Sequence, residues 1–82
     1  MLELIRVDGS TEQVVNFSLE NLQKLVGGYI EALYAHDGRM LVVDEEGRLK
    51  NKPVNPAASA IFGYIVVGDV VVGNRSAFPV DW

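Results

Sequence analysis

Short apolar runs separated by turn residues dominate the chain and predict strands. The runs cover residues 2–7, 13–17, 29–34, 40–43, 64–67 and 70–72. Turn or bulge signals separate several of them: Asp8-Gly9-Ser10, Asp37-Gly38 and Gly68-Asp69. The run at 40–43 is wholly apolar, which is typical of a central strand. The last two runs predict either two strands or one bent strand.

Two segments have helical spacing instead. Leu19, Leu22, Leu25 and Val26 recur at helical intervals, after Ser18 as the N-cap and before Gly27-Gly28 as the terminator.

The second helix begins at Asn55-Pro56, because Asn caps well and Pro is tolerated at the first helical position. It continues through Ala57, Ala58, Ala60, Ile61 and Phe62 and ends at Gly63. The three alanines favour close packing against a sheet.

The order of these elements predicts an α+β fold, a small and mainly antiparallel sheet with two short helices packed on one face. No internal repeat or linker interrupts the chain, so we expect a single domain over residues 1–82. Within it, residues 72–82 are expected to form a C-terminal tail in which Phe78 and Trp82 anchor on this chain or on a neighbouring one.

Composition and charge narrow the functional classes. The chain has 82 residues, no cysteine and a net charge of −4, which disfavours binding to a nucleic-acid backbone. No apolar run approaches the roughly 18 residues of a membrane span, and residues 1–6 do not resemble a signal peptide. We therefore expect a soluble, cytoplasmic protein. A chain this small without disulfides has a limited core, so we also expect a homo-oligomer.

Few residues favour catalysis. The only histidine, His36, lies at a turn, there is no cysteine, and no serine occupies a nucleophile elbow. The acidic turn Asp44-Glu45-Glu46, with Glu31 near the same ladder end, lacks the ligand spacing of a calcium loop. We read these carboxylates as a solvated turn and expect no catalytic residue, no cofactor and no metal.

An anion site is the strongest functional candidate. The start of the second helix is expected to expose the amides of Ala57 and Ala58, and basic or amide side chains precede it. A tyrosine could stack on a base; Tyr29 and Tyr34 point to opposite faces of a strand, so one is expected to be core and the other exposed. The predicted ligand-binding residues are Arg48, Lys50, Asn51, Lys52, Asn55, Ala57, Ala58 and Tyr29.

Three segments together resemble a known family. They are residues 22–31, with Gly27-Gly28-Tyr29-Ile30-Glu31, residues 43–49, and Asn55-Pro56-Ala57-Ala58 followed by 65–72. In this order and spacing they resemble the domain of unknown function 3846 family, whose members look like short proteins of phages, plasmids and other mobile elements. The resemblance extends from about Ser18 to Val72. It implies a mobile-element setting and a role against or alongside host systems, and it implies no reaction.

Three functions remain open. The first is a non-enzymatic module that sequesters an anionic, nucleotide-type signal of host defence. The second is a protein-interaction module that inhibits or modulates a host protein through Glu31, the acidic turn and the hydrophobic tail. The third is a small metal-dependent nuclease that uses Glu31 and the acidic turn. The first hypothesis is preferred on the mobile-element resemblance, the missing catalytic set and the cationic approach to Asn55.

Overall fold

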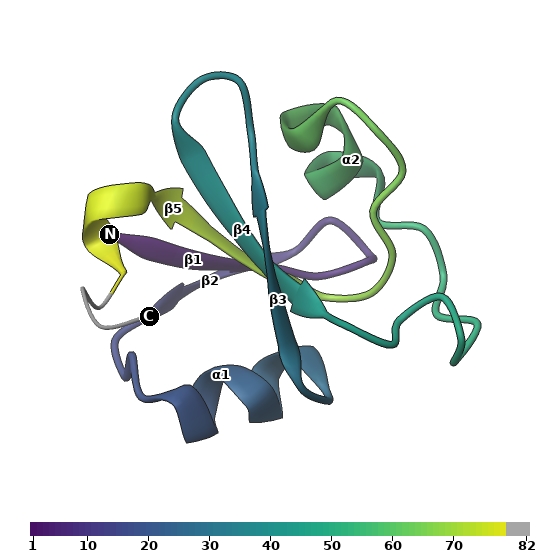
Figure 1. Cartoon of the computed structure of the whole chain (residues 1–82), viewed down its shortest axis with the longest axis horizontal. Coiled ribbons are helices and arrows are strands. Elements are labelled where there is room, and N and C mark those ends of the chain that lie inside the picture. Colours follow the sequence, from purple (N-terminus) through teal and green to yellow (C-terminus); the bar gives the residue numbers. More distant parts are fainter. Residues whose placement is uncertain (79–82) are drawn as a thin grey trace.

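The computed structural model describes residues 1–78, and its five strands form one antiparallel sheet (Figure 1). The elements are β1 (Leu2–Ile5), β2 (Thr11–Val14), α1 (Leu19–Val26), β3 (Ile30–Tyr34), β4 (Arg39–Asp44), α2 (Pro56–Phe62), β5 (Val70–Asn74) and the 3₁₀ turn η1 (Arg75–Ala77). The strand order is β2-β1-β5-β4-β3, and every pairing is antiparallel. The α+β class is confirmed, and β4 lies inside the sheet as its apolar sequence predicts.

Both helices begin and end where local signals place them. The Ser18 side chain accepts a hydrogen bond from the Asn21 amide at 3.1 Å, and Gly27 closes α1 in the left-handed region with φ 87°. Asn55 caps α2, Pro56 is its first residue, and Gly63 closes it with φ 91°. These predicted boundaries are confirmed. They could be predicted because each depends on groups within one turn of the helix end.

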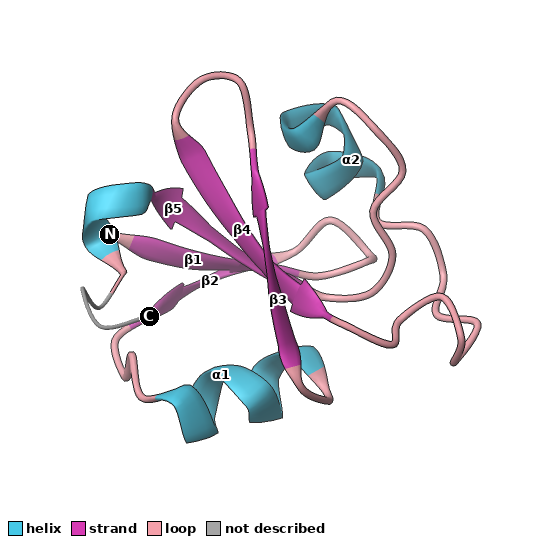
Figure 2. Ribbon diagram, viewed as in Figure 1, coloured by secondary structure: helices cyan, strands magenta, loops and turns pink. Residues whose placement is uncertain are grey.

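The two helices lie on opposite faces of the sheet, so the expected packing on one face is wrong (Figure 2). Leu22 and Val26 of α1 pack in one cluster with Val42 and Val71, whereas Ala58 of α2 packs in the other. Alternate residues of β4 and β5 point to opposite faces, so both faces of these strands are covered. Their central residues are all apolar, and this pattern alone does not show whether helices cover one face of the sheet or both.

The end of the chain also differs from expectation. Residues 72–74 belong to β5 and Phe78 is buried in the α1 cluster, so the expected tail at 72–82 begins too early. The aromatic Phe78 anchors on its own chain, while Trp82 lies outside the described residues.

Residues 64–67 do not form the expected strand. The Ser59 hydroxyl accepts a hydrogen bond from the Val66 amide at 2.8 Å, and only Val67 forms an isolated bridge, with Val54. Residues 64–67 therefore form an irregular segment that connects α2 to β5. Among residues 1–78, no helix has the length and apolar character needed to cross a bilayer.

Candidate functional site

The two lysines of the predicted anion site lie at the wrong helix end. Lys52 Nζ donates to the Val26 carbonyl at 2.6 Å, and Lys50 Nζ donates to the Gly27 carbonyl at 3.1 Å. Both ammonium groups therefore sit at the C-terminus of α1, where unpaired carbonyls and the negative end of the helix dipole favour cations. They are not poised over the start of α2.

The same two lysines also neutralise a buried carboxylate. Asp44 Oδ2 lies 2.7 Å from Lys52 Nζ and 2.9 Å from Lys50 Nζ, and the Asp44 side chain is only 1% exposed. Asp44 Oδ1 accepts the Glu46 amide at 2.9 Å. Burial raises the pKa of the Asp44 carboxyl, but the hydrogen bonds from Lys52, Lys50 and Glu46 outweigh burial and bring this pKa from 3.8 to about 2. We call this arrangement of Asp44, Lys50 and Lys52 on the α1 carbonyls the lysine corner.

A glycine makes the lysine corner possible. A Cβ on Gly28 would lie 2.7 Å from Lys50 Nζ and 2.8 Å from Asp44 Oδ1, closer than real Cβ atoms come. Gly28 therefore leaves room for the ion pair, while Gly27 supplies the left-handed cap. The Gly27-Gly28 step that carries the family resemblance thus has a structural explanation.

The start of α2 is occupied by the side chain that caps it. Asn55 is fully buried; its Oδ1 accepts the Ala58 amide at 3.1 Å, and its Nδ2 donates to the carbonyls of Ile5 at 3.0 Å and Gly68 at 2.9 Å. Asn55 is therefore a structural link between α2, β1 and the turn before β5. The expectation of an open Ala58 amide is wrong, because Asn55 already satisfies it.

The remaining predicted ligand residues are dispersed. Ala57 is exposed at the start of α2, and Asn51 has φ 55° in the exposed loop before it. Tyr29 lies beside Lys50 in a shallow hollow at the end of α1, away from the start of α2. Tyr29 and Tyr34 are both exposed, so the expectation that one is core is wrong. The structure does not bring the eight predicted residues together as one anion site.

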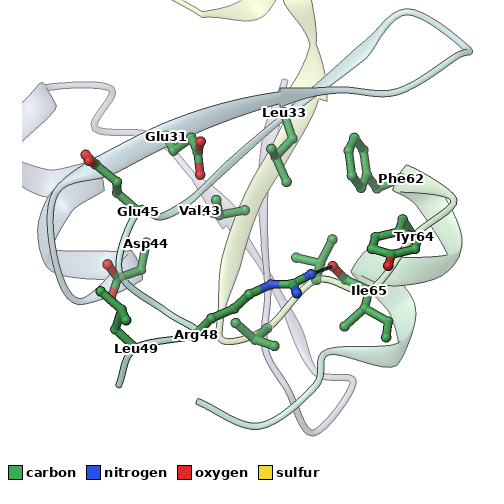
Figure 3. Close-up of a pocket in the computed structure, with 12 residues that line it drawn as sticks. Glu31, Leu33, Val43, Asp44, Glu45, Arg48, Leu49, Phe62, Tyr64 and Ile65 are labelled. Atoms are coloured by element: carbon green, nitrogen blue, oxygen red, sulfur yellow. Dashed lines mark hydrogen bonds between the residues drawn. The ribbon is translucent and has the colours of Figure 1, made fainter. Parts of the chain in front are cut away.

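Arg48 lines a separate hollow, on the opposite side of β4 from α1. This hollow, which we call the β3 cleft, has a volume of about 190 Å³ (Figure 3). Twelve residues line it: Glu31, Leu33, Val43, Asp44, Glu45, Arg48, Leu49, Phe62, Tyr64, Ile65, Val66 and Val67. The exposed Arg48 side chain extends toward Ile65 and donates to its carbonyl at 3.2 Å (Figure 3).

The walls of the β3 cleft are apolar and partly uncovered. Leu33 and Phe62 pack against the α2 cluster, but Leu49, Tyr64 and Ile65 are large apolar residues exposed to solvent. These three residues lie in loops after a turn or a helix end. Loops have no helical or strand periodicity, so the sequence pattern did not identify these residues as part of one surface. Tyr64 and Ile65 were instead expected to lie in a strand.

Two carboxylates stand on the rim of the cleft beside β3 and β4. Glu31 pairs with Val43 in the ladder, and Glu45 follows Val43 by two residues, so Glu31 and Glu45 share one face (Figure 3). Within residues 1–78, neither carboxylate has an ion pair or a side-chain hydrogen bond. Glu31 lies one register position from Asp44 at the end of the ladder, as expected, but the Asp44 carboxylate points into the lysine corner, so Glu45 is the acidic residue that shares a face with Glu31.

The expected lack of a catalytic set remains a prediction. His36 is exposed in the β3–β4 turn and is not among the residues that line the cleft. Within the described part of the chain, no three His, Cys, Asp or Glu side chains gather in a way that could hold a metal ion.

Comparison with known proteins places the chain in a family. No curated protein and no solved structure matches it. A family model described as Domain of unknown function (DUF3846) matches residues 2–76, which include every strand, both helices, the lysine corner and the β3 cleft. The chain therefore belongs to the DUF3846 family.

Proposed function

We propose that this protein is a non-enzymatic protein-interaction module that binds a segment of another protein in the β3 cleft. The observation that supports this most is the uncovered apolar wall of Leu49, Tyr64 and Ile65 around a concave site. Grouped apolar side chains on a small soluble domain mark interaction surfaces, because leaving them in water has no structural benefit. No histidine, cysteine or serine is among the described residues that line the cleft, which disfavours nucleophilic catalysis of the Ser-His or Cys-His type there.

Charge favours a protein segment over the nucleotide-type ligand. The residues that line the cleft include Glu31 and Glu45, which have no side-chain partners within residues 1–78, against one cation, Arg48, so the local charge disfavours a polyanion. The lysines that were expected to hold phosphate already bind Asp44. Sequestration of a nucleotide signal therefore stays a prediction from the sequence, supported by no assembled site among residues 1–78.

The biological setting belongs to the same proposal. The resemblance of the chain implied a phage, plasmid or other mobile element, and a small binding module there would act on a protein of the host cytoplasm. Inhibition or modulation of that protein requires only occupancy of one of its surfaces, which suits an 82-residue chain.

A matched pair of tyrosines provides the test. A library of random twelve-residue peptides is panned on the immobilised protein, and binders are measured on Tyr64→Ser and Tyr29→Ser variants. The two tyrosines are similarly exposed, at 67% and 70%, but only Tyr64 lines the β3 cleft. We expect Tyr64→Ser to weaken binding about tenfold, the effect of losing one aromatic anchor, and Tyr29→Ser to leave binding unchanged. Absence of peptide binders, or equal loss in both variants, would overturn the proposal.

A further inference from the structure

The outer edge of β3 carries backbone groups that no described strand uses. β3 is the last strand in the order, with β4 as its only neighbour among the described strands. Two hydrogen bonds fix which residues face β4: the Glu45 amide donates to the Tyr29 carbonyl, and the Ala35 amide donates to the Arg39 carbonyl, both at 2.9 Å. Hydrogen-bonded pairs alternate along an antiparallel ladder, so the odd-numbered residues 29–35 bond to β4. The amides and carbonyls of Ile30, Ala32 and Tyr34 therefore point away from the sheet.

The side chains on this edge lead directly into the β3 cleft. Glu31 and Leu33 are two residues apart, share one face of β3, and both line the cleft. A strand added along the outer edge would place its own alternate side chains on the same face, beside Glu31 and Leu33. These positions oppose each other in non-hydrogen-bonded pairs, in which cross-strand side chains are closest.

The opposite edge of the sheet is different. β2 is only four residues long, and its first three residues, Thr11, Glu12 and Gln13, are polar and exposed. Short polar edges discourage pairing with another chain. The apolar cleft and the longer edge thus coincide at β3 and not at β2.

We propose that the bound segment adds to the outer edge of β3 as an extra antiparallel strand, with a basic residue opposite Glu31 and an apolar residue opposite Leu33. This inference rests on the proposed function and adds the mode of binding and the chemistry of the partner. Because the pairing is antiparallel, the partner sequence, read from its N-terminus, is an apolar residue, then any residue, then a basic residue. The basic residue neutralises Glu31 and Glu45, which otherwise face each other diagonally as like charges.

A second copy of this chain fits the edge less well. Antiparallel pairing of two β3 strands about Ala32 would set each Glu31 opposite a Leu33 and would bring four unpaired rim carboxylates into one interface. Unpaired like charges at an interface disfavour association. The charge on the rim therefore selects a basic partner.

The test uses a labelled nine-residue peptide, Thr-Thr-Val-Thr-Leu-Thr-Lys-Thr-Thr, and fluorescence anisotropy. In the proposed register the threonine between Leu and Lys bonds to Ala32. N-methylation of that threonine should weaken binding at least about tenfold, because it removes a backbone donor within a ladder. N-methylation of the neighbouring Leu or Lys, whose amides point away from β3, should change binding less than about threefold.

Variants of the protein test the same register. Ala32→Pro removes only an outward amide and fills the outer edge, so it should abolish peptide binding while β3 stays paired with β4. Glu31→Lys should reverse the charge preference, so that a peptide with Glu in place of Lys binds better. If Ala32→Pro fails to fold, the N-methylated peptides carry the test alone.

Three outcomes would overturn the inference. One is equal binding of the Lys and Glu peptides, a second is an N-methylation effect that does not alternate, and a third is no binding of the Lys peptide at all. In each case library peptides that depend on Tyr64 would leave the proposed function standing. A concentration-dependent dimer that Ala32→Pro abolishes would instead assign the edge to a second copy of the chain.

Discussion

The lysine corner and the β3 cleft adjoin at Asp44 and differ in how completely their polar groups are satisfied. In the lysine corner, one carboxylate, two ammonium groups and two helix carbonyls satisfy one another. In the cleft, Glu31 and Glu45 have no side-chain partners within residues 1–78, and apolar side chains meet solvent. The comparison teaches that lysines clustered in the sequence can serve only to bind the free carbonyls at a helix C-terminus. Polar and apolar groups that remain without partners are better indicators of a functional site than such a cluster.

The largest expected effect comes from removing the carboxylate of the lysine corner. Asp44→Ala leaves two ammonium groups and the Glu46 amide without their acceptor, so we expect a loss of about 3 kcal/mol in the free energy of unfolding. Urea unfolding at pH 7 measures it. The neighbouring Glu45→Ala is the matched control and should change stability by less than about 0.5 kcal/mol, because Glu45 is exposed. Equal losses in both variants would contradict the contrast between the two regions.

Acid should weaken the same region. The pKa of Asp44 is about 2 in the folded protein and 3.8 as its ordinary value, so the unfolded chain binds the proton more readily. The stabilisation is present above about pH 4 and is lost as the pH falls toward 2, with a total of about 2 kcal/mol. Urea unfolding of the wild type and of Asp44→Asn at pH 5 and pH 2.5 isolates this contribution. Parallel losses in the two proteins would show that Asp44 does not supply it.

Lys50 and Lys52 should each contribute less to the free energy of unfolding than Asp44 does, and their contributions should be unequal. Lys52 is 22% exposed and Lys50 is 40% exposed, so solvent screens the second ion pair more strongly. We expect Lys52→Met to lower the free energy of unfolding by about 1 kcal/mol and Lys50→Met by about half as much. Thermal melts at low and high salt provide the measurement. A larger loss for Lys50→Met would reverse the assigned order.

Local signals in the sequence predicted the helices, and long-range contacts explain what they missed. Ser18, Gly27, Asn55 and Gly63 act within one turn of a helix end, and all four were predicted correctly. The placement of the helices on opposite faces depends on how the chain crosses the sheet, which no local pattern records. The apolar run at 64–67 was expected to be a strand, but Ser59 binds Val66 on both its amide and its carbonyl and holds the segment against α2.

The candidate site was harder to predict because it depends on pairs far apart in sequence. Lys52 and Val26 are joined by a hydrogen bond across 26 positions, and Asn55 reaches Ile5 across 50. Neither contact produces a recognisable residue spacing in the sequence, so the basic residues before α2 were expected to be available for a ligand. The acidic rim was visible as Glu31 and the turn after 43, but the apolar wall of the cleft was not, because its residues come from separate loops.

Amide chemical-shift mapping on the isotopically labelled protein tests the central claim most directly, because it observes both regions at once. The protein is titrated with the Leu-Thr-Lys peptide and separately with linear and cyclic nucleotides, each to about 1 mM, the limit of weak specific binding. Saturable shifts from the peptide at Leu33, Val43 and Ile65, and none from any nucleotide at Lys50, Lys52 or Ala57, are the predicted result. Saturable nucleotide shifts at those three residues, with the cleft silent toward the peptide, would contradict it.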